Sequence, residues 1–235
     1  IEKVNAGKAP VGFFNYLRDT AVLDIAGTVG FDFVVIDNEH TGMERETTEK
    51  LILAAELNQV VPFVRVPELI PYLMRNYMEM GARGILVPHI RSGAECRTAQ
   101  EALRYPPYGN ASCCRSNHAD GFEAKNWMKY LDHVQELVFV PMIEDPEAIE
   151  HLDEIADFVA DIAKKGASFH GIMTSDDSLA IGSIKYAQKK GIRIPEDLSV
   201  MGYNNSMLTN CCTPELTSVD NRLETQTHQL VQTLL

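Results

Sequence analysis

Three segments of the sequence place acidic, basic and cationic side chains directly after short apolar runs. The segment IDNEHTG carries Asp37, Glu39 and His40, VRVP carries Arg65, and PMIEDPEA carries Glu144. His can transfer a proton near neutral pH, Arg can hold an oxo-acid and its enolate, and a carboxylate can bind a divalent metal. Such a set suits the polarisation of a small oxo-acid on a metal. The alternative is structural, because carboxylates at strand ends often cap the next helix and a single His there is often a solvated loop residue.

A fourth segment, TSDDSLAIGSIKYAQKKG, begins at Thr174 and has two adjacent carboxylates with competing interpretations. Asp176 could bind a divalent metal together with Glu144. Asp177 could instead accept a hydrogen bond from a sugar hydroxyl. The choice between them decides which class of function the last third of the chain supports.

The elements that position these residues alternate along the chain. β-Branched and aromatic runs alternate with longer amphipathic segments, which is typical of parallel strands linked by crossover helices. We expect strands within residues 11–17, 31–38, 60–67, 82–90, 137–144, 169–175, 198–204 and 216–221. We expect helices within residues 19–30, 44–58, 68–81, 93–107, 145–166, 177–191 and 222–235. Eight strands in strict β-α order favour a closed (βα)8 TIM-like barrel over an open doubly wound sheet, and the barrel places its chemistry at the carboxyl ends of the strands.

Composition excludes several function classes. Lys and Arg number 21 against 33 Asp and Glu, so the net charge of −12 repels nucleic acids and anionic membranes. The sequence contains no run of about 18 apolar residues, and the N-terminal segment lacks the apolar core of a signal peptide, so we expect a cytoplasmic protein. The five cysteines include the adjacent pairs Cys113-Cys114 and Cys211-Cys212, which favour reduced thiols over disulfides or zinc.

The first two thirds of the chain resemble a known enzyme family. The blocks GFDFVVIDNEHTG, VRVP, GARGILVPHI, YPPYG and VPMIEDPEAIEHLDEI, within residues 1–158, together resemble the HpcH/HpaI metal-dependent pyruvate aldolases. The resemblance implies a (βα)8 barrel that cleaves 4-hydroxy-2-oxo acids to pyruvate and an aldehyde with Mg²⁺, Mn²⁺ or Co²⁺. Carried over to this sequence, it implies that His40 is the catalytic base, that Arg65 steadies the oxo-acid and its enolate, and that Glu144 is a metal ligand.

Three departures from that family's pattern put its activity in doubt. Glu79 stands where the family usually has an Asp paired with the base, so the resemblance makes Glu79 the candidate partner of His40. An Arg-Gly pair is expected after YPPYG, but NASCCRSNHADGF follows, with Arg115 and His118 as candidate substitutes. The family's G-P-x-D-L-S loop, which supplies a second metal carboxylate after strand six, is absent, and Asp176 occupies its place.

The last third resembles a different family. The blocks DDSLAIG, IPEDLSVMGYNN and PELTSV, between about residues 167 and 235, resemble the C-terminal subdomain of LacI-type regulators and periplasmic sugar-binding proteins. This resemblance implies that Asp177, Asn204 and Asn205 contact a small ligand such as a sugar. The helix-turn-helix and the first ligand-binding subdomain of such a regulator do not occur in this sequence, so we do not expect it to repress transcription.

The two resemblances together suggest a chimera, natural or engineered. Residues 1–158 supply βα units one to five, residues 159–235 supply units six to eight of a flavodoxin-like or periplasmic-binding-protein type, and the whole chain forms one barrel domain. The alternative is a natural relative of the aldolases whose last third has drifted.

These considerations predict a carbon-carbon lyase and leave two non-catalytic alternatives. The lyase hypothesis is a metal-dependent pyruvate aldolase, impaired or without its metal if Asp176 does not replace the second carboxylate. The competing hypothesis is a non-catalytic chimeric scaffold that binds small polyols or anions, and sugar binding as in the regulators ranks third. We expect a small oxo-acid or small polar ligand as partner and neither nucleic acid nor membrane, while the sequence leaves the oligomeric state open.

Overall fold

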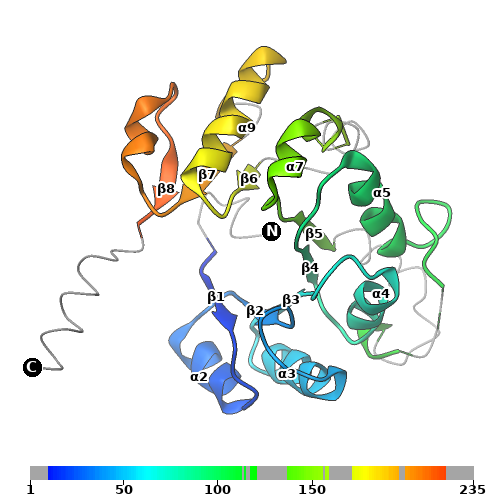
Figure 1. Cartoon of the computed structure of the whole chain (residues 1–235). Coiled ribbons are helices and arrows are strands. Elements are labelled where there is room, and N and C mark those ends of the chain that lie inside the picture. Colours follow the sequence, from blue (N-terminus) through cyan, green and yellow to red (C-terminus); the bar gives the residue numbers. More distant parts are fainter. Residues whose placement is uncertain are drawn as a thin grey trace, which may run out of the picture. The chain divides into compact units, whose positions relative to one another are not determined.

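A computed structural model describes residues 10–112, 114, 117–120, 137–155, 157–158, 171–195 and 199–220. All eight expected strands occur in it, each within its expected segment (Figure 1). The strands are β1 (Gly12–Asn15), β2 (Phe33–Asp37), β3 (Val61–Arg65), β4 (Gly84–Val87), β5 (Val138–Pro141), β6 (Gly171–Met173), β7 (Ser199–Tyr203) and β8 (Thr217–Val219). The helices are α2 (Ala21–Val29), α3 (Arg45–Leu57), α4 (Pro71–Glu79), α5 (Gly93–Ala102), α7 (Pro146–Glu150) and α9 (Asp177–Lys189), with 3₁₀ turns η1 (His118–Asp120) and η3 (Met207–Cys211). The helix expected within residues 222–235 lies outside the described residues.

The strands form two parallel sheets, so the fold is α/β. The first sheet has the order β1-β2-β3-β4-β5 and the second the order β6-β7-β8. No ladder of hydrogen bonds joins the two sheets within the described ranges, so the closed barrel expected from the sequence is not seen as continuous strand pairing. By contacts the chain divides into a first unit of residues 1–89 with 95–141 and a second unit of residues 90–94 with 142–235.

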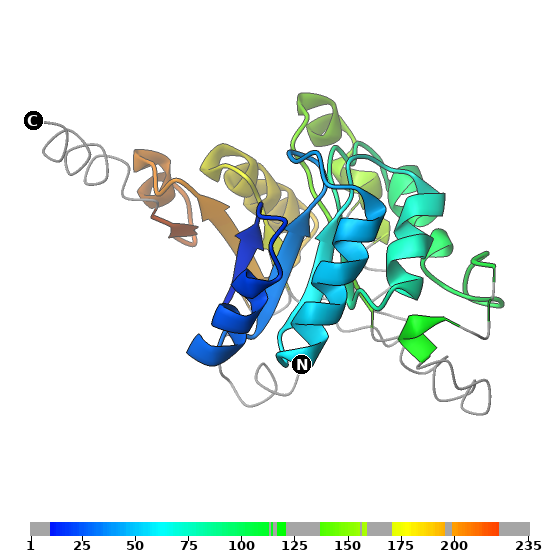
Figure 2. The same ribbon diagram turned by 90° about the horizontal axis from the view of Figure 1, so that it is seen from below.

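In the first unit, helices cover one face of the five-stranded sheet. Helices α2 and α3 lie side by side along the strands (Figure 2), and α3 and α4 contact β2, β3 and β4. The fully buried side chains include Leu51 and Ile52 of α3, Met74 of α4, and Ile36 of β2. Burial of such side chains contributes about 1.5 to 3 kcal/mol each, so this layer holds the strand ends of the first sheet in place.

Helix α2 ends as its sequence predicts. Gly30 adopts the left-handed conformation with φ 86°, and its amide donates to the carbonyls of Ala26 and Gly27. A side chain would be strained there, which explains why the helix ends at a glycine.

In the second unit, α9 covers the three-stranded sheet. The core consists of Ala180, Ile184 and Ala187 on α9, with Val200 of β7 and Leu216, which precedes β8. The spacing of three and four residues on α9 places one apolar stripe against the sheet.

Two further sequence expectations concern the whole chain. None of the helices in the described ranges is long and apolar enough to cross a membrane. The cysteines among the described residues, Cys96, Cys114, Cys211 and Cys212, are free thiols, as expected.

Candidate functional site

The carboxyl ends of β2 and β3 are tied together by a buried ion pair. The parallel register makes Asp37 and Arg65 direct partners, and both side chains are buried. Arg65 Nε donates to Asp37 Oδ1 over 2.9 Å, and Nη2 donates to Oδ2 over 2.7 Å. This two-point contact fixes the plane of the guanidinium group.

Asp37 also shapes the loop that follows β2. Its Oδ1 accepts hydrogen bonds from the amides of Glu39 at 2.9 Å and His40 at 3.4 Å, and its carbonyl accepts one from the Thr41 hydroxyl. Burial by itself raises the pKa of Asp37, but the hydrogen bonds from Arg65 and the Glu39 amide, with the charge of Arg65, outweigh it and lower the pKa below its usual value. Asp37 is therefore an ionised anchor for both Arg65 and the loop.

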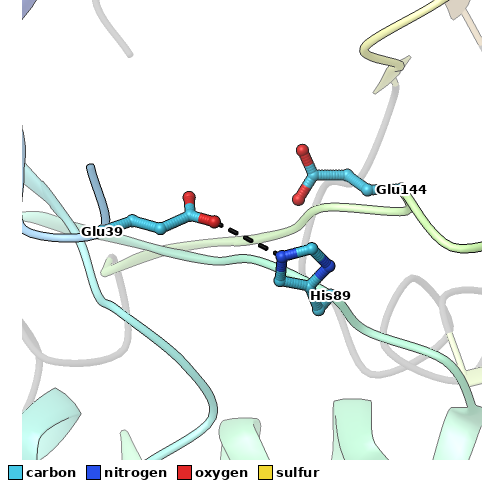
Figure 3. Close-up of side chains that lie close together, drawn as sticks. All are labelled: Glu39, His89 and Glu144. Carbon is cyan, nitrogen blue, oxygen red and sulfur yellow. Dashed lines mark ion pairs between the residues drawn. The ribbon is translucent and has the colours of Figure 1, made fainter.

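Glu39 lies between Arg65 and two histidines. Its side chain is only 9% exposed, and Oε2 lies 3.1 Å from Arg65 Nη1 and 3.7 Å from His40 Nε2. Its other oxygen, Oε1, lies 3.4 Å from His89 Nε2, an ion pair when His89 is protonated (Figure 3). Although Oε2 is buried, no hydrogen bond reaches it from the described part of the chain.

His89 was not predicted from the sequence. It follows β4 by two residues, so it emerges at the same sheet edge as Arg65 and the loop after β2. Its backbone is left-handed, with φ 55°, and non-glycine residues in this conformation concentrate at functional sites. The signal that could have found it is its place in LVPHI, directly beyond a buried strand end.

The structure places the predicted residues of the first unit at two different sheet edges. The side chain of His40 is 65% exposed. Glu39 lies next to both His40 and the buried Arg65. Glu79 ends α4, the helix that leads back to the start of β4, so it lies near the opposite edge of the sheet. Burial raises the pKa of Glu79, and the charge of Arg75 partly offsets this effect. The structure therefore does not bring Glu79 to His40 as the sequence analysis expected.

His118, one of the two loop residues proposed as substitutes, does not extend this cluster. His118 Nε2 lies 2.6 Å from Glu56 Oε2 on α3, and a side chain at Gly81, just beyond α4, would contact both residues. His118 thus belongs with the end of α4 rather than with the loop after β2. Arg115 lies outside the described residues.

Glu144 is connected to the first sheet through β5. It follows the last residue of that strand by three positions, so its Cα lies within about 11 Å of the strand end. Its side chain is partly buried. Chain continuity alone thus keeps Glu144 near the edge where β4 and β5 end.

In the second unit, Asp176 caps a helix. Its Oδ1 accepts hydrogen bonds from the amide of Ser178, at 2.7 Å, and from the Ser178 hydroxyl, at the start of α9. Asn204 Nδ2 reaches Oδ2 at 3.4 Å. Hydrogen bonds from Ser178 lower the pKa of Asp176. Asp176 therefore has a capping function already.

Asp177 is buried and holds the loop after β7 and strand β8 of the second unit. Its Oδ2 accepts from the Ser206 amide at 2.6 Å, and its Oδ1 accepts from the Ser218 hydroxyl at 2.5 Å. Burial raises its pKa, but the hydrogen bonds from Ser218 and Ser206 outweigh burial and lower it. Asn204 and Asn205, at φ 93° and 47°, form the left-handed turn leading to Ser206. Asp177 thus faces Ser206 and Ser218 of its own unit, whereas Asn204 and Asn205 are exposed.

Comparison with known proteins shows that this chain is similar to two different groups of proteins. A sequence model of the periplasmic binding protein-like domain matches residues 113–235. The chain belongs to this family. An HTH-type transcriptional regulator of Lachnoclostridium phytofermentans is 42% identical over 85 residues, which is 36% of this chain and 26% of the regulator. The chain thus spans about a quarter of that relative.

The second similarity is to aldolases. A pyruvate aldolase of Rhizobium etli is 28% identical over 210 residues, covering 83% of this chain and 82% of the aldolase. Residues 1–158 are about two thirds of the chain, so this alignment continues into the periplasmic binding protein-like part. The HpcH/HpaI aldolase of Desulfitobacterium hafniense shares the fold, with a TM-score of 0.70, 19% identity, and coverage of 99% of this chain and 95% of that one. The resemblance of the first part to the HpcH/HpaI aldolases and of the last part to LacI-type regulators is thereby confirmed.

Proposed function

We propose that this protein is a divalent-metal-dependent aldolase that cleaves 4-hydroxy-2-oxo acids to pyruvate and an aldehyde. The observation that carries the proposal is the buried guanidinium of Arg65, fixed by Asp37 and adjacent to Glu39 at the carboxyl edge of the first sheet. Two of its five N–H groups are used by Asp37, and Nη1 faces the loop that carries Glu39 and His40. Similarity to a pyruvate aldolase over 83% of the chain supports the same reaction class.

The residues present fit a divalent metal. Glu39 and His89, both in the first unit, offer a carboxylate and an imidazole, with Oε1 and Nε2 3.4 Å apart. The buried Glu39 Oε2, which has no hydrogen bond in the described part of the chain, is a suitable oxygen donor. We propose Glu144 and Glu39 as the carboxylate ligands, with Asp176 as the alternative to Glu39 that the sequence suggested. When bound, the metal would draw electron density from the 2-oxo group of the substrate.

The remaining steps belong to side chains of this chain. Arg65 holds the oxo-acid, and its positive charge faces the oxygen on which negative charge develops. His40 accepts the proton of the 4-hydroxyl group while the bond between C3 and C4 breaks and the aldehyde leaves. The electron pair of that bond enters the enolate of pyruvate, and return of a proton to C3 completes pyruvate.

We also propose that the two sheets complete one (βα)8 barrel, with βα units one to five before residue 159 and units six to eight after it. Three features support this proposal: eight parallel strands in β-α order, sheets of five and three strands, and the likeness of fold to an HpcH/HpaI aldolase over nearly the whole chain. In such a barrel the carboxyl ends of the strands share one face.

The test is pyruvate release from a 4-hydroxy-2-oxo acid by the purified chain with Mn²⁺. We expect measurable cleavage above the buffer rate, and a loss in kcat/KM of at least about 100-fold in Glu144→Ala. Glu147→Ala is the matched control, because Glu147 is exposed and lies 3.8 Å from Arg91 on the surface, and it should retain activity. A comparison of Glu39→Gln with Asp176→Asn identifies the second carboxylate ligand. Only the variant that removes a true ligand should bind Mn²⁺ more weakly.

Absence of pyruvate release by the unaltered chain at every Mn²⁺ concentration would contradict the aldolase proposal. That outcome would favour the non-catalytic scaffold that binds a small polar ligand. Sugar binding through Asp177 has less support, because that carboxylate is buried and accepts hydrogen bonds from Ser206 and Ser218.

A further inference from the structure

We propose that His89 binds the metal together with Glu39 and gives the site a preference for Co²⁺ over Mg²⁺. The inference rests on the proposed metal site, but it concerns a different property, the choice of metal. It starts from the pair of Glu39 and His89, which are both in the first unit and are held by different strand ends, after β2 and after β4.

The separation of the two side chains fits ligands of a single ion. Metal–oxygen and metal–nitrogen bonds are about 2.1 Å long, so two ligands that meet at tetrahedral or octahedral angles lie about 3.0 to 3.4 Å apart. Glu39 Oε1 and His89 Nε2 are 3.4 Å apart. An ion could therefore be held by both atoms without movement of either strand end.

The environment of Glu39 points to a cation as well. Its side chain is more than nine-tenths buried, yet no hydrogen bond from the described residues reaches Oε2. The nearest cationic group is Arg65 Nη1. The other two nitrogens of the same guanidinium, Nε and Nη2, donate hydrogen bonds to Asp37, whose negative charge Arg65 therefore already balances. A buried carboxylate in this position can accept a second cation, because one guanidinium balances only one of the two charges.

The donor type decides which ion is favoured. Carboxylate and water oxygens suit Mg²⁺, whereas an imidazole nitrogen suits transition metals, and affinity rises from Mn²⁺ to Co²⁺. A carboxylate-only site would discriminate less between these ions. His89 is thus a determinant of metal specificity.

The experiment measures metal binding to the full chain by isothermal titration calorimetry and by the visible absorption of bound Co²⁺. In His89→Gln, which replaces nitrogen by an amide oxygen, we expect Co²⁺ affinity to fall at least about 10-fold and Mg²⁺ affinity to change less than about 3-fold. The Co²⁺ absorption should also change, because one nitrogen leaves the coordination sphere. His151→Gln is the matched control, since His151 forms an exposed pair with Glu154 at 3.2 Å and should leave binding unchanged.

Two outcomes overturn the inference: equal Co²⁺ affinity in the unaltered chain and His89→Gln, or no Co²⁺ binding by the unaltered chain. Circular dichroism of His89→Gln verifies that it folds. The proposed function fails separately, if the unaltered chain binds metal but releases no pyruvate.

Discussion

The carboxylate of Asp37 connects the chemistry of the site to the stability of the first sheet. It accepts two hydrogen bonds from Arg65 and two from the amides of the loop after β2. Ionised groups out of water are costly unless they are paired and hydrogen-bonded, and here both conditions are met. Loss of Asp37 would remove both of these hydrogen bonds from Arg65 and leave Arg65 with its ion pair to Glu39 at 3.1 Å.

Asp37→Asn tests this argument. We expect the free energy of unfolding at pH 7 to fall by about 1.5 to 3 kcal/mol, because the variant loses the charged hydrogen bonds between Asp37 and the buried Arg65, which keeps only its ion pair with Glu39. Urea denaturation followed by circular dichroism measures the change. Glu46→Gln is the control: Glu46 lies 2.6 Å from Lys50, but both side chains are exposed and the variant should be nearly as stable as the original chain. Equal losses in the two variants would contradict the role given to Asp37.

Residue types predicted part of this site and not the rest. Arg65 and His40 were found because Arg65 ends an apolar strand and His40 lies in the loop after one, where α/β proteins place functional groups. Glu39, mentioned only as a member of the loop, and His89 are brought together across strand ends 50 residues apart in sequence. Asp177 was expected to meet a ligand, but Ser206 from the loop after β7 and Ser218 from β8 donate hydrogen bonds to it. Contacts of this kind depend on tertiary packing, which local sequence does not reveal.

At the scale of elements, the sequence was more informative. Each strand lies within its expected segment because β-branched and aromatic runs flanked by turn residues have few other ways to be buried. The hydrophobic pattern could not predict whether the strands of the two sheets pair with one another. Parallel strands have the same apolar runs in a closed barrel and in an open sheet.

Helix α9 and strand β7 offer a matched pair of glycines for a stability test. A side chain at Gly182 on α9 would meet no atom within 4 Å, whereas one at Gly202 on β7 would overlap Asp177 Oδ1 and lie 2.9 Å from Leu216. Gly182→Ala should therefore raise the free energy of unfolding by about 0.5 to 1 kcal/mol through helix propensity. Gly202→Ala should lower it by about 1 to 3 kcal/mol through overpacking. Thermal unfolding by calorimetry compares the two, and a stabilising effect of Gly202→Ala would contradict the close packing around Asp177.

At the scale of the whole molecule, each unit carries, among the residues that the structure describes, one buried carboxylate with a lowered pKa. Asp37 belongs to the first unit and Asp177 to the second. A carboxylate whose pKa is lower in the folded state stabilises the fold above its unfolded pKa of about 3.9, and this stability is lost as the pH falls through the folded pKa. Both units should therefore lose stability below about pH 4.

Acid unfolding can thus test whether the two sheets form one cooperative barrel. Ser218→Ala removes a hydrogen bond to Asp177, so the pKa of Asp177 should rise and the second unit should unfold at higher pH. If the eight strands complete one barrel, β3 in the first unit should become susceptible to pepsin at the same raised pH as α9 in the second. Mass spectrometry of the peptides released between pH 2 and pH 5 reports both segments in one experiment.

Ser183→Ala is the control for Ser218→Ala. It shows whether the loss of any hydroxyl group in the second unit raises the pH of unfolding. The Ser183 hydroxyl donates to the carbonyl of Leu179 on the same helix, at 3.0 Å, so its removal should not shift the pH at which either segment is cut. If Ser218→Ala exposes α9 at a higher pH while β3 keeps its original midpoint, the units unfold independently and the single barrel is contradicted. A common shift would mean that a residue matching the regulator family stabilises strands matching the aldolases, as a barrel completed by both parts of the chain requires.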